Sequence, residues 1–81
     1  MSLYLFQPPV ADGTFTVRVL DPALNIRAQP SLTTKINGVI HDKGIYTIVA
    51  TSFEPKTQIT WGKLKSDAGW ISLGSKYVKK I

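Results

Sequence analysis

The chain has 81 residues, which allows one small domain, and its 43% apolar content is enough for one compact core. It contains no cysteine, which excludes disulfides and thiolate chemistry, and no apolar run reaches the roughly 18 residues of a membrane span. We therefore expect no membrane insertion. The net charge of +5 favours anionic partners such as nucleic acid, anionic lipid or wall polymer, although lysines also keep small domains soluble.

The first elements in chain order are an N-terminal extension or linker over residues 1–13 and a domain over residues 14–81. Met1-Ser2-Leu3 has the form of a vector-derived start, and no basic region precedes the apolar residues that follow. We therefore expect no signal peptide here. Gln7-Pro8-Pro9 predicts an extended entry, because proline fixes φ and restricts the residue before it.

The rest of the chain predicts short strands. Apolar and polar residues alternate, β-branched residues are frequent, and no window shows helical periodicity. In Leu24–Arg27, for example, Leu24 and Ile26 should face the core and Asn25 and Arg27 the other side. The expected strands are Phe15–Leu20, Leu24–Arg27, Val39–Ile40, Ile45–Ala50, Ile59–Lys65, Trp70–Leu73 and Tyr77–Ile81.

The connections between these strands carry turn residues. Asn37-Gly38 and Lys43-Gly44 predict turns, Ser52–Gln58 predicts a loop around Pro55, and Ser66–Gly69 predicts a tight hairpin connection. Residues 74–77 allow at most one short helical turn. The fold class expected from this pattern is all-β, a small barrel of five to seven short antiparallel strands.

Catalytic chemistry has few candidates in this chain. His41 is the only histidine, and the five carboxylates lie in or next to predicted turns. General acid–base catalysis needs a positioned partner, and a metal site needs several ligands at suitable spacing. No glycine-rich phosphate loop is present. We therefore expect no enzyme, no catalytic residue, no metal and no cofactor.

Several segments together resemble bacterial SH3 domains. Leu24-Asn25-Ile26-Arg27-Ala28-Gln29-Pro30-Ser31 is similar to the early strand and loop of that family, and Gly38-Val39-Ile40 and Lys43-Gly44-Ile45-Tyr46 fit its next segments. Trp61-Gly62-Lys63-Leu64-Lys65 and Gly69-Trp70-Ile71-Ser72-Leu73 resemble its hairpin, and Tyr77–Ile81 its closing strand. The resemblance covers residues 15–81 and is greatest to copies attached to wall hydrolases of Firmicutes and phages.

The resemblance implies an SH3-like barrel that binds peptidoglycan through its peptide stem or cross-bridge. It also implies an attached catalytic domain in a parent protein, such as a muramidase, an amidase or an NlpC/P60 peptidase, and an extracellular or cell-wall location. Two loops depart from the family pattern, Ser52–Gln58 and Gly74-Ser75-Lys76. Both border the expected ligand groove, so the ligand itself stays open.

The candidate ligand residues are mostly aromatic. Trp61 is out of phase with Leu64 and is expected on the face away from the core, where it either binds ligand or covers the barrel edge. Trp70 and Tyr46 are candidates for which core packing is the favoured alternative. Tyr77 either lines the groove or caps the barrel.

Polar groups and one loop aromatic complete the candidate site. Arg27 is able to bind a ligand carboxylate with two parallel hydrogen bonds, although a structural hydrogen bond across the loop to Pro30 is slightly preferred. Asn25 shares its strand face. Phe53 lies in one of the two unusual loops.

Two other functions are weighed against wall binding. A proline-peptide adaptor of the eukaryotic SH3 type would carry tyrosines and an acidic loop, whereas Asp21–Ser31 has no tyrosine and one acidic residue. Nucleic-acid binding would use the positive charge and the two tryptophans, but basic residues alternate with aromatic ones only around Trp61. We expect nucleic acid not to be the partner.

Overall fold

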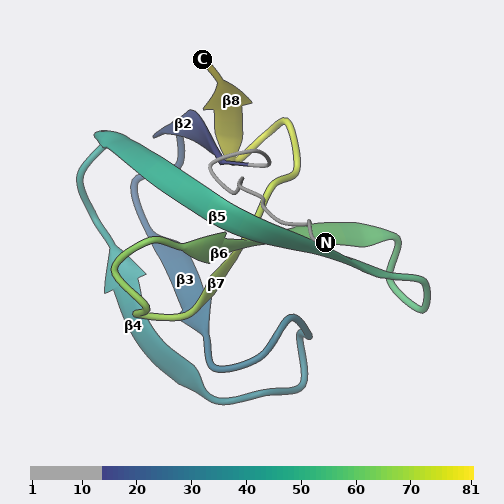
Figure 1. The fold of residues 1–81 in the computed structure, drawn as a ribbon. Helices are drawn as coiled ribbons and strands as arrows, with labels where there is room; N and C mark the ends of the chain where they lie inside the picture. The colour runs from purple at the N-terminus through teal and green to yellow at the C-terminus, as the bar shows by residue number, and fades with distance from the viewer. Residues whose placement is uncertain (1–13) are drawn as a thin grey trace, which may run out of the picture.

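The computed structural model describes residues 14–81, so the predicted extension over residues 1–13 lies outside the described residues. The described part of the chain contains strands and no helix (Figure 1), which confirms the all-β prediction. The strands are β2 (Phe15–Val19), β3 (Leu24–Arg27), β4 (Ile36–Ile40), β5 (Ile45–Glu54), β6 (Ile59–Leu64), β7 (Trp70–Ser72) and β8 (Val78–Lys80).

These strands form one antiparallel sheet in the order β4-β3-β7-β6-β5-β2-β8. The predicted hairpin between β6 and β7 is present, with Gly62 opposite Ile71 and Lys63 opposite Trp70. The β5–β6 hairpin is the longest pairing and extends away from the rest of the sheet (Figure 1). As a result, segments far apart in sequence become neighbours: β3 lies next to β7, and β2 lies between β5 and β8.

The sheet curls around a single apolar interior. In a flat sheet the edge strands β4 and β8 would lie about 29 Å apart, at roughly 4.8 Å per strand. Instead, every described strand contributes a buried residue to one cluster, which gives the fold its barrel-like character. The cluster consists of Val17, Val19, Leu24, Ile40, Ile48, Leu64, Ile71 and Val78. Leu24 and Ile26 both contact this interior while Asn25 is exposed, as the alternation predicts.

Two predicted connections are wrong. Asn37-Gly38 was expected as a turn but lies inside β4, where Gly38 pairs with Ile26. The loop expected over Ser52–Gln58 is shorter, because β5 continues to Glu54. Pairing with β6 holds those residues in the strand and leaves only residues 55–58 as the turn.

The link before β8 agrees with its prediction. The backbone N–H groups of Tyr77 and Val78 both donate to the carbonyl of Gly74, at 2.9 and 3.1 Å, so the chain makes one hydrogen-bonded turn and no helix.

Gly69 allows β3 and β7 to approach each other. Its φ is +142°, and a Cβ at this position would lie 2.4 Å from the carbonyl oxygen of Arg27. The Asn37 side chain on β4 holds the segment before β7 in the same region by donating to the carbonyl of Ala68 at 3.0 Å. Glycine is therefore required here, and this close approach places Arg27 opposite Trp70.

Candidate functional site

One hollow brings together candidate residues from distant parts of the chain. It has a volume of about 180 Å³ and is lined from β3, β6, β7 and the segment before β8, and also by Leu32 from the loop between β3 and β4. We call it the binding groove. Its predicted members are Asn25, Arg27, Trp61 and Tyr77, and its unpredicted members are Ala23, Leu24, Leu32, Ile59 and Ser72.

Trp61 forms a buried wall of the groove. The expectation of an exposed ring is wrong, because only 2% of the residue is accessible. Trp61 is nevertheless outside the interior cluster that contains Leu64. Its Nε1–H donates to the Glu54 carboxylate at 3.1 Å. Trp61 therefore lies behind the exposed lining of the groove, and a hydrogen bond fixes its orientation.

Glu54 fixes that indole and is a residue that sequence reasoning missed. The Thr57 hydroxyl donates to its carboxylate at 2.6 Å. This hydrogen bond is the largest influence on the pKa of Glu54 and lowers it; desolvation opposes the shift, while hydrogen bonds from Trp61, Ser31 and the Leu32 backbone reinforce it. The carboxylate thus connects the turn between β5 and β6 to the indole of Trp61 on β6.

The hairpin register explains how Glu54 reaches Trp61. Ser52 is the cross-strand partner of Trp61, and Glu54 is the partner of Ile59. Because cross-strand partners share a face and side chains alternate along a strand, all of these residues lie on one face, with Glu54 diagonal to Trp61. The sequence places Glu54 seven positions before Trp61, but that spacing becomes informative only once the turn is known to span 55–58.

Arg27 has both a structural and an exposed part. One guanidinium nitrogen, Nη1, donates to the carbonyl of Thr34 at 3.1 Å. A bond across the loop was expected, but to Pro30. The loop is further closed by the N–H of Ala28, which donates to the carbonyl of Lys35 at 2.8 Å. A guanidinium has five N–H donors, so the anchored Arg27 still presents donors to the groove.

Tyr77 is half-buried at the other side of the groove. Its ring packs against the interior cluster and also lines the groove. Its backbone carbonyl accepts from the N–H groups of Leu20 and Asp21, at 2.7 and 3.3 Å. These hydrogen bonds attach the segment before β8 to the end of β2.

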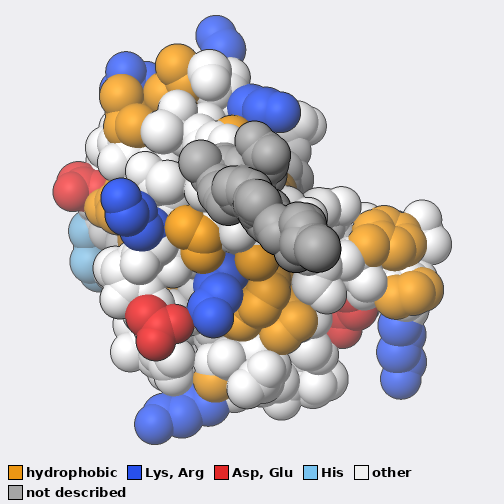
Figure 2. All heavy atoms as spheres, viewed as in Figure 1, with side chains coloured by type: hydrophobic (Ala, Val, Ile, Leu, Met, Phe, Trp, Pro, Cys, Tyr) orange, Lys and Arg blue, Asp and Glu red, His pale blue; other side chains and the backbone are white. Residues whose placement is uncertain are grey.

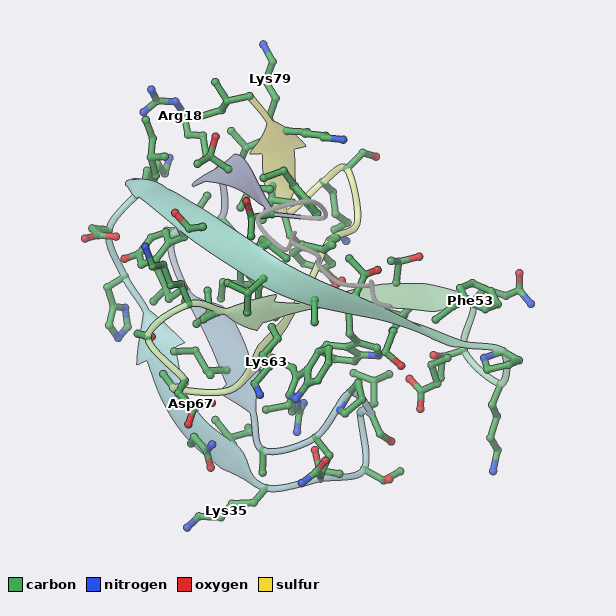
Figure 3. The ribbon with its side chains drawn as sticks, in the orientation of Figure 1. Arg18, Lys35, Phe53, Lys63, Asp67 and Lys79 are labelled. Atoms are coloured by element: carbon green, nitrogen blue, oxygen red, sulfur yellow. The ribbon has the colours of Figure 1, made fainter. Side chains whose placement is uncertain are left out.

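The remaining candidates lie outside the groove. Trp70 is half-buried and belongs neither to the groove lining nor to the interior cluster. Tyr46 packs against the interior, and its hydroxyl donates to Asp42, a hydrogen bond that raises the pKa of Tyr46. Phe53 is 54% exposed near the tip of the β5–β6 hairpin, pointing away from the body of the molecule (Figure 3).

The described residues hold few groups suited to metal or acid–base chemistry. Residues 14–81 contain no group of three or more His, Cys, Asp or Glu side chains that would hold a metal ion. His41 is exposed, next to Asp42. No helix in this part of the chain is long and apolar enough to cross a membrane.

In comparisons with family models, curated proteins and solved structures, nothing matches this chain.

Proposed function

We propose that this chain is a non-catalytic module of the bacterial SH3 type that binds the peptide part of peptidoglycan through the binding groove. The observation that carries the proposal is the convergence of Asn25, Arg27, Trp61 and Tyr77 on one hollow. These residues come from the segments whose motifs resemble that family.

The chemistry of the groove suits an extended peptide. Leu32, Ile59 and Tyr77 supply apolar and aromatic surface in front of the buried Trp61 ring, while Arg27 and the exposed Asn25 supply hydrogen-bonding groups. Ligand sites commonly combine mostly apolar walls with a few polar groups that fix orientation. A groove this small holds a short stretch of chain, so we expect modest affinity.

Modest affinity is sufficient for a targeting module. Binding to the wall would raise the effective substrate concentration for a catalytic domain in the same parent chain. On this proposal the partners are peptidoglycan and an attached hydrolase, and the location is extracellular or at the cell wall.

Sedimentation with purified Gram-positive sacculi tests the proposal. The unmodified chain is expected to pellet with the sacculi, and the double variant Asn25→Ala, Arg27→Lys is expected to stay largely in the supernatant. Lysine keeps the charge of Arg27 but lacks its planar fork of donors. Thermal denaturation of each variant establishes that it is folded.

Phe53→Ala is the matched control, because Phe53 is exposed and outside the groove. It should pellet like the unmodified chain. Wall binding is wrong if the unmodified chain remains soluble with every wall type. The groove is the wrong site if Phe53→Ala loses binding while the double variant retains it. Binding to proline-rich peptides or to nucleic acid in place of sacculi would assign one of the alternative functions.

A further inference from the structure

The outer face of three neighbouring strands forms a surface separate from the binding groove. β8, β2 and β5 are adjacent at one end of the sheet. Arg18 on β2 is the cross-strand partner of both Lys79 on β8 and Ile45 on β5, and cross-strand partners share a face. Because Val17 and Val19 on either side of Arg18 are buried in the interior, this shared face is the outer one. We call it the basic face.

The basic face continues along β5 to the end of β6. Thr47 and Val49 lie on either side of the buried Ile48, so their side chains point outward like that of Ile45. Lys65 follows β6 and is exposed, and its N–H donates to the carbonyl of Thr47 at 3.0 Å. The face therefore presents two exposed aliphatic side chains among three cations, Arg18, Lys65 and Lys79.

The cations of this face lack a described counter-charge. Arg18 and Lys79 are directly opposite each other, and both side chains are exposed (Figure 3). Like charges in this arrangement destabilise a strand pair. The ion pair found within residues 14–81 is elsewhere, between Lys63 and Asp67. An anion from outside this part of the chain would relieve the repulsion.

The acidic groups of β5 and of the segment before it have other partners. Asp42 accepts a hydrogen bond from the Tyr46 hydroxyl. Glu54, at the far end of β5, accepts hydrogen bonds from Thr57 and Trp61. The outward side chains of β2, β8 and the first half of β5 include no acid. The basic face is therefore complementary to a negatively charged surface.

The aliphatic side chains of the face are well exposed. Ile45 is 53% exposed and Val49 is 37% exposed. Figure 2 shows Lys and Arg side chains next to hydrophobic ones at the top of the view, where Figure 1 places β2 and β8. Interfacial helices bind anionic membranes with the same combination, cations for the lipid phosphates and apolar groups for the headgroup boundary.

This combination favours a lipid surface over a polymer. A phosphate polymer or a nucleic acid would contact the cations and leave Ile45 and Val49 unused. The outward residues of β2, β8 and the first half of β5 also include no aromatic ring on which a base could stack. A lipid surface uses both kinds of group, because its phosphates attract the cations and its headgroup region accepts the aliphatic side chains.

We propose that the basic face is a peripheral docking site for anionic phospholipid headgroups. The chain would lie on the membrane surface without crossing it. None of the residues of the basic face lines the binding groove, so this proposal does not depend on the proposed function. A chain with both activities would be held where wall and membrane are close together.

Sedimentation with lipid vesicles tests the proposal. One set of vesicles contains phosphatidylglycerol and phosphatidylcholine in equal amounts, and the other contains phosphatidylcholine alone. The unmodified chain should pellet with the anionic vesicles and stay in the supernatant with the neutral ones. Added salt should weaken the binding, because it screens exposed charges.

The double variant Arg18→Gln, Lys79→Gln should lose most of this binding. The expected loss is about 5-fold in the partition coefficient for each charge removed, or roughly 25-fold in all. The variant also removes a like-charge contact, so its thermal midpoint should equal or exceed that of the unmodified chain.

The matched control is Lys35→Gln, Lys56→Gln. It removes the same charge from two exposed lysines outside the basic face, with Lys35 at the opposite end of the molecule from Arg18 and Lys79 (Figure 3). It should bind anionic vesicles nearly as well as the unmodified chain. This comparison separates the basic face from net charge.

A second pair of variants tests the aliphatic contribution. Ile45→Ser should lower the partition into anionic vesicles by a factor that salt leaves unchanged, because apolar contacts are not screened. Ile36→Ser is its control, since Ile36 is 44% exposed on β4 at the opposite edge of the sheet. It should have little effect.

Three outcomes would overturn the proposal, and none of them bears on sedimentation with sacculi. Equal binding to anionic and neutral vesicles, or to neither, excludes an anionic lipid site. Equal loss in the two double variants assigns the binding to net charge. If Ile45→Ser binds vesicles as tightly as Ile36→Ser, the aliphatic groups are not used and the face belongs to a phosphate polymer or a nucleic acid.

Discussion

Glu54 holds the indole of Trp61, which forms the buried wall of the binding groove. Its carboxylate accepts hydrogen bonds from Thr57 and Trp61, and bonds from Ser31 and the Leu32 backbone also lower its pKa. A carboxylate that the sequence placed in a predicted loop is therefore a positioning residue.

The lowered pKa of Glu54 makes part of the stability pH-dependent. A group whose pKa is lower in the folded state stabilises the fold above its unfolded pKa, and this contribution is lost as pH falls through the folded value. The ordinary value is 4.5, so the contribution should be complete at pH 6 and should decline below about pH 4.5. Urea midpoints of the unmodified chain and of Glu54→Gln should therefore differ more at pH 6 than at pH 3.

Thr57→Val is the matched variant for this measurement. It removes the hydrogen bond with the largest effect on the pKa of Glu54 while nearly preserving the side-chain volume. Its midpoint should also approach that of the unmodified chain as pH falls. A difference that is constant from pH 6 to pH 3 for both variants would show that the ionised carboxylate of Glu54 and its hydrogen bonds do not contribute to stability.

At the scale of elements, the close approach of Gly69 to the Arg27 backbone positions Arg27 at the groove. Gly69→Ala would place a methyl group 2.4 Å from the Arg27 carbonyl, at a φ of +142° that other residues rarely adopt. Backbone strain of this kind costs about 1–3 kcal/mol. We predict that loss in the free energy of unfolding, measured by urea denaturation.

Gly38→Ala is the control for Gly69→Ala. A Cβ at Gly38 meets nothing closer than 4.0 Å, and this glycine has no positive φ. Replacing it should be neutral or stabilise the fold by up to about 1 kcal/mol, because alanine reduces the freedom of the unfolded chain. If the two substitutions have the same effect, the close approach of β3 and β7 does not require glycine at position 69.

Local patterns predicted most elements but not where their pairing extends. Alternation in Leu24–Arg27 identified the inward and outward faces of β3 correctly. Asn37-Gly38 looked like a turn because these residues are common in hairpin turns, yet pairing with β3 keeps them in β4. For the same reason β5 runs on to Glu54, past the point where its β-branched residues end.

At the scale of the molecule, the burial of Trp61 could not be predicted from the sequence. Its strand and its phase were predicted, but its exposure depends on a loop that approaches from a different part of the chain. Leu32 and Ile59 line the groove beside Trp61, and no local pattern indicates that they meet. The hollow itself arises only when the curled sheet brings β3 next to β7 and places Tyr77 beside both.

The central claim, that a stem peptide binds in the groove, is tested most directly by NMR titration of the chain with L-Ala-γ-D-Glu-L-Lys-D-Ala. Two tryptophans give two indole N–H signals, one from Trp61 in the groove and one from Trp70 outside it. We predict shifts of the Trp61 indole and of the Asn25, Ser72 and Tyr77 amides, with the Trp70 indole nearly unchanged. Shifts confined to the surroundings of Phe53 or Tyr46, or no shifts at saturating peptide, would contradict it.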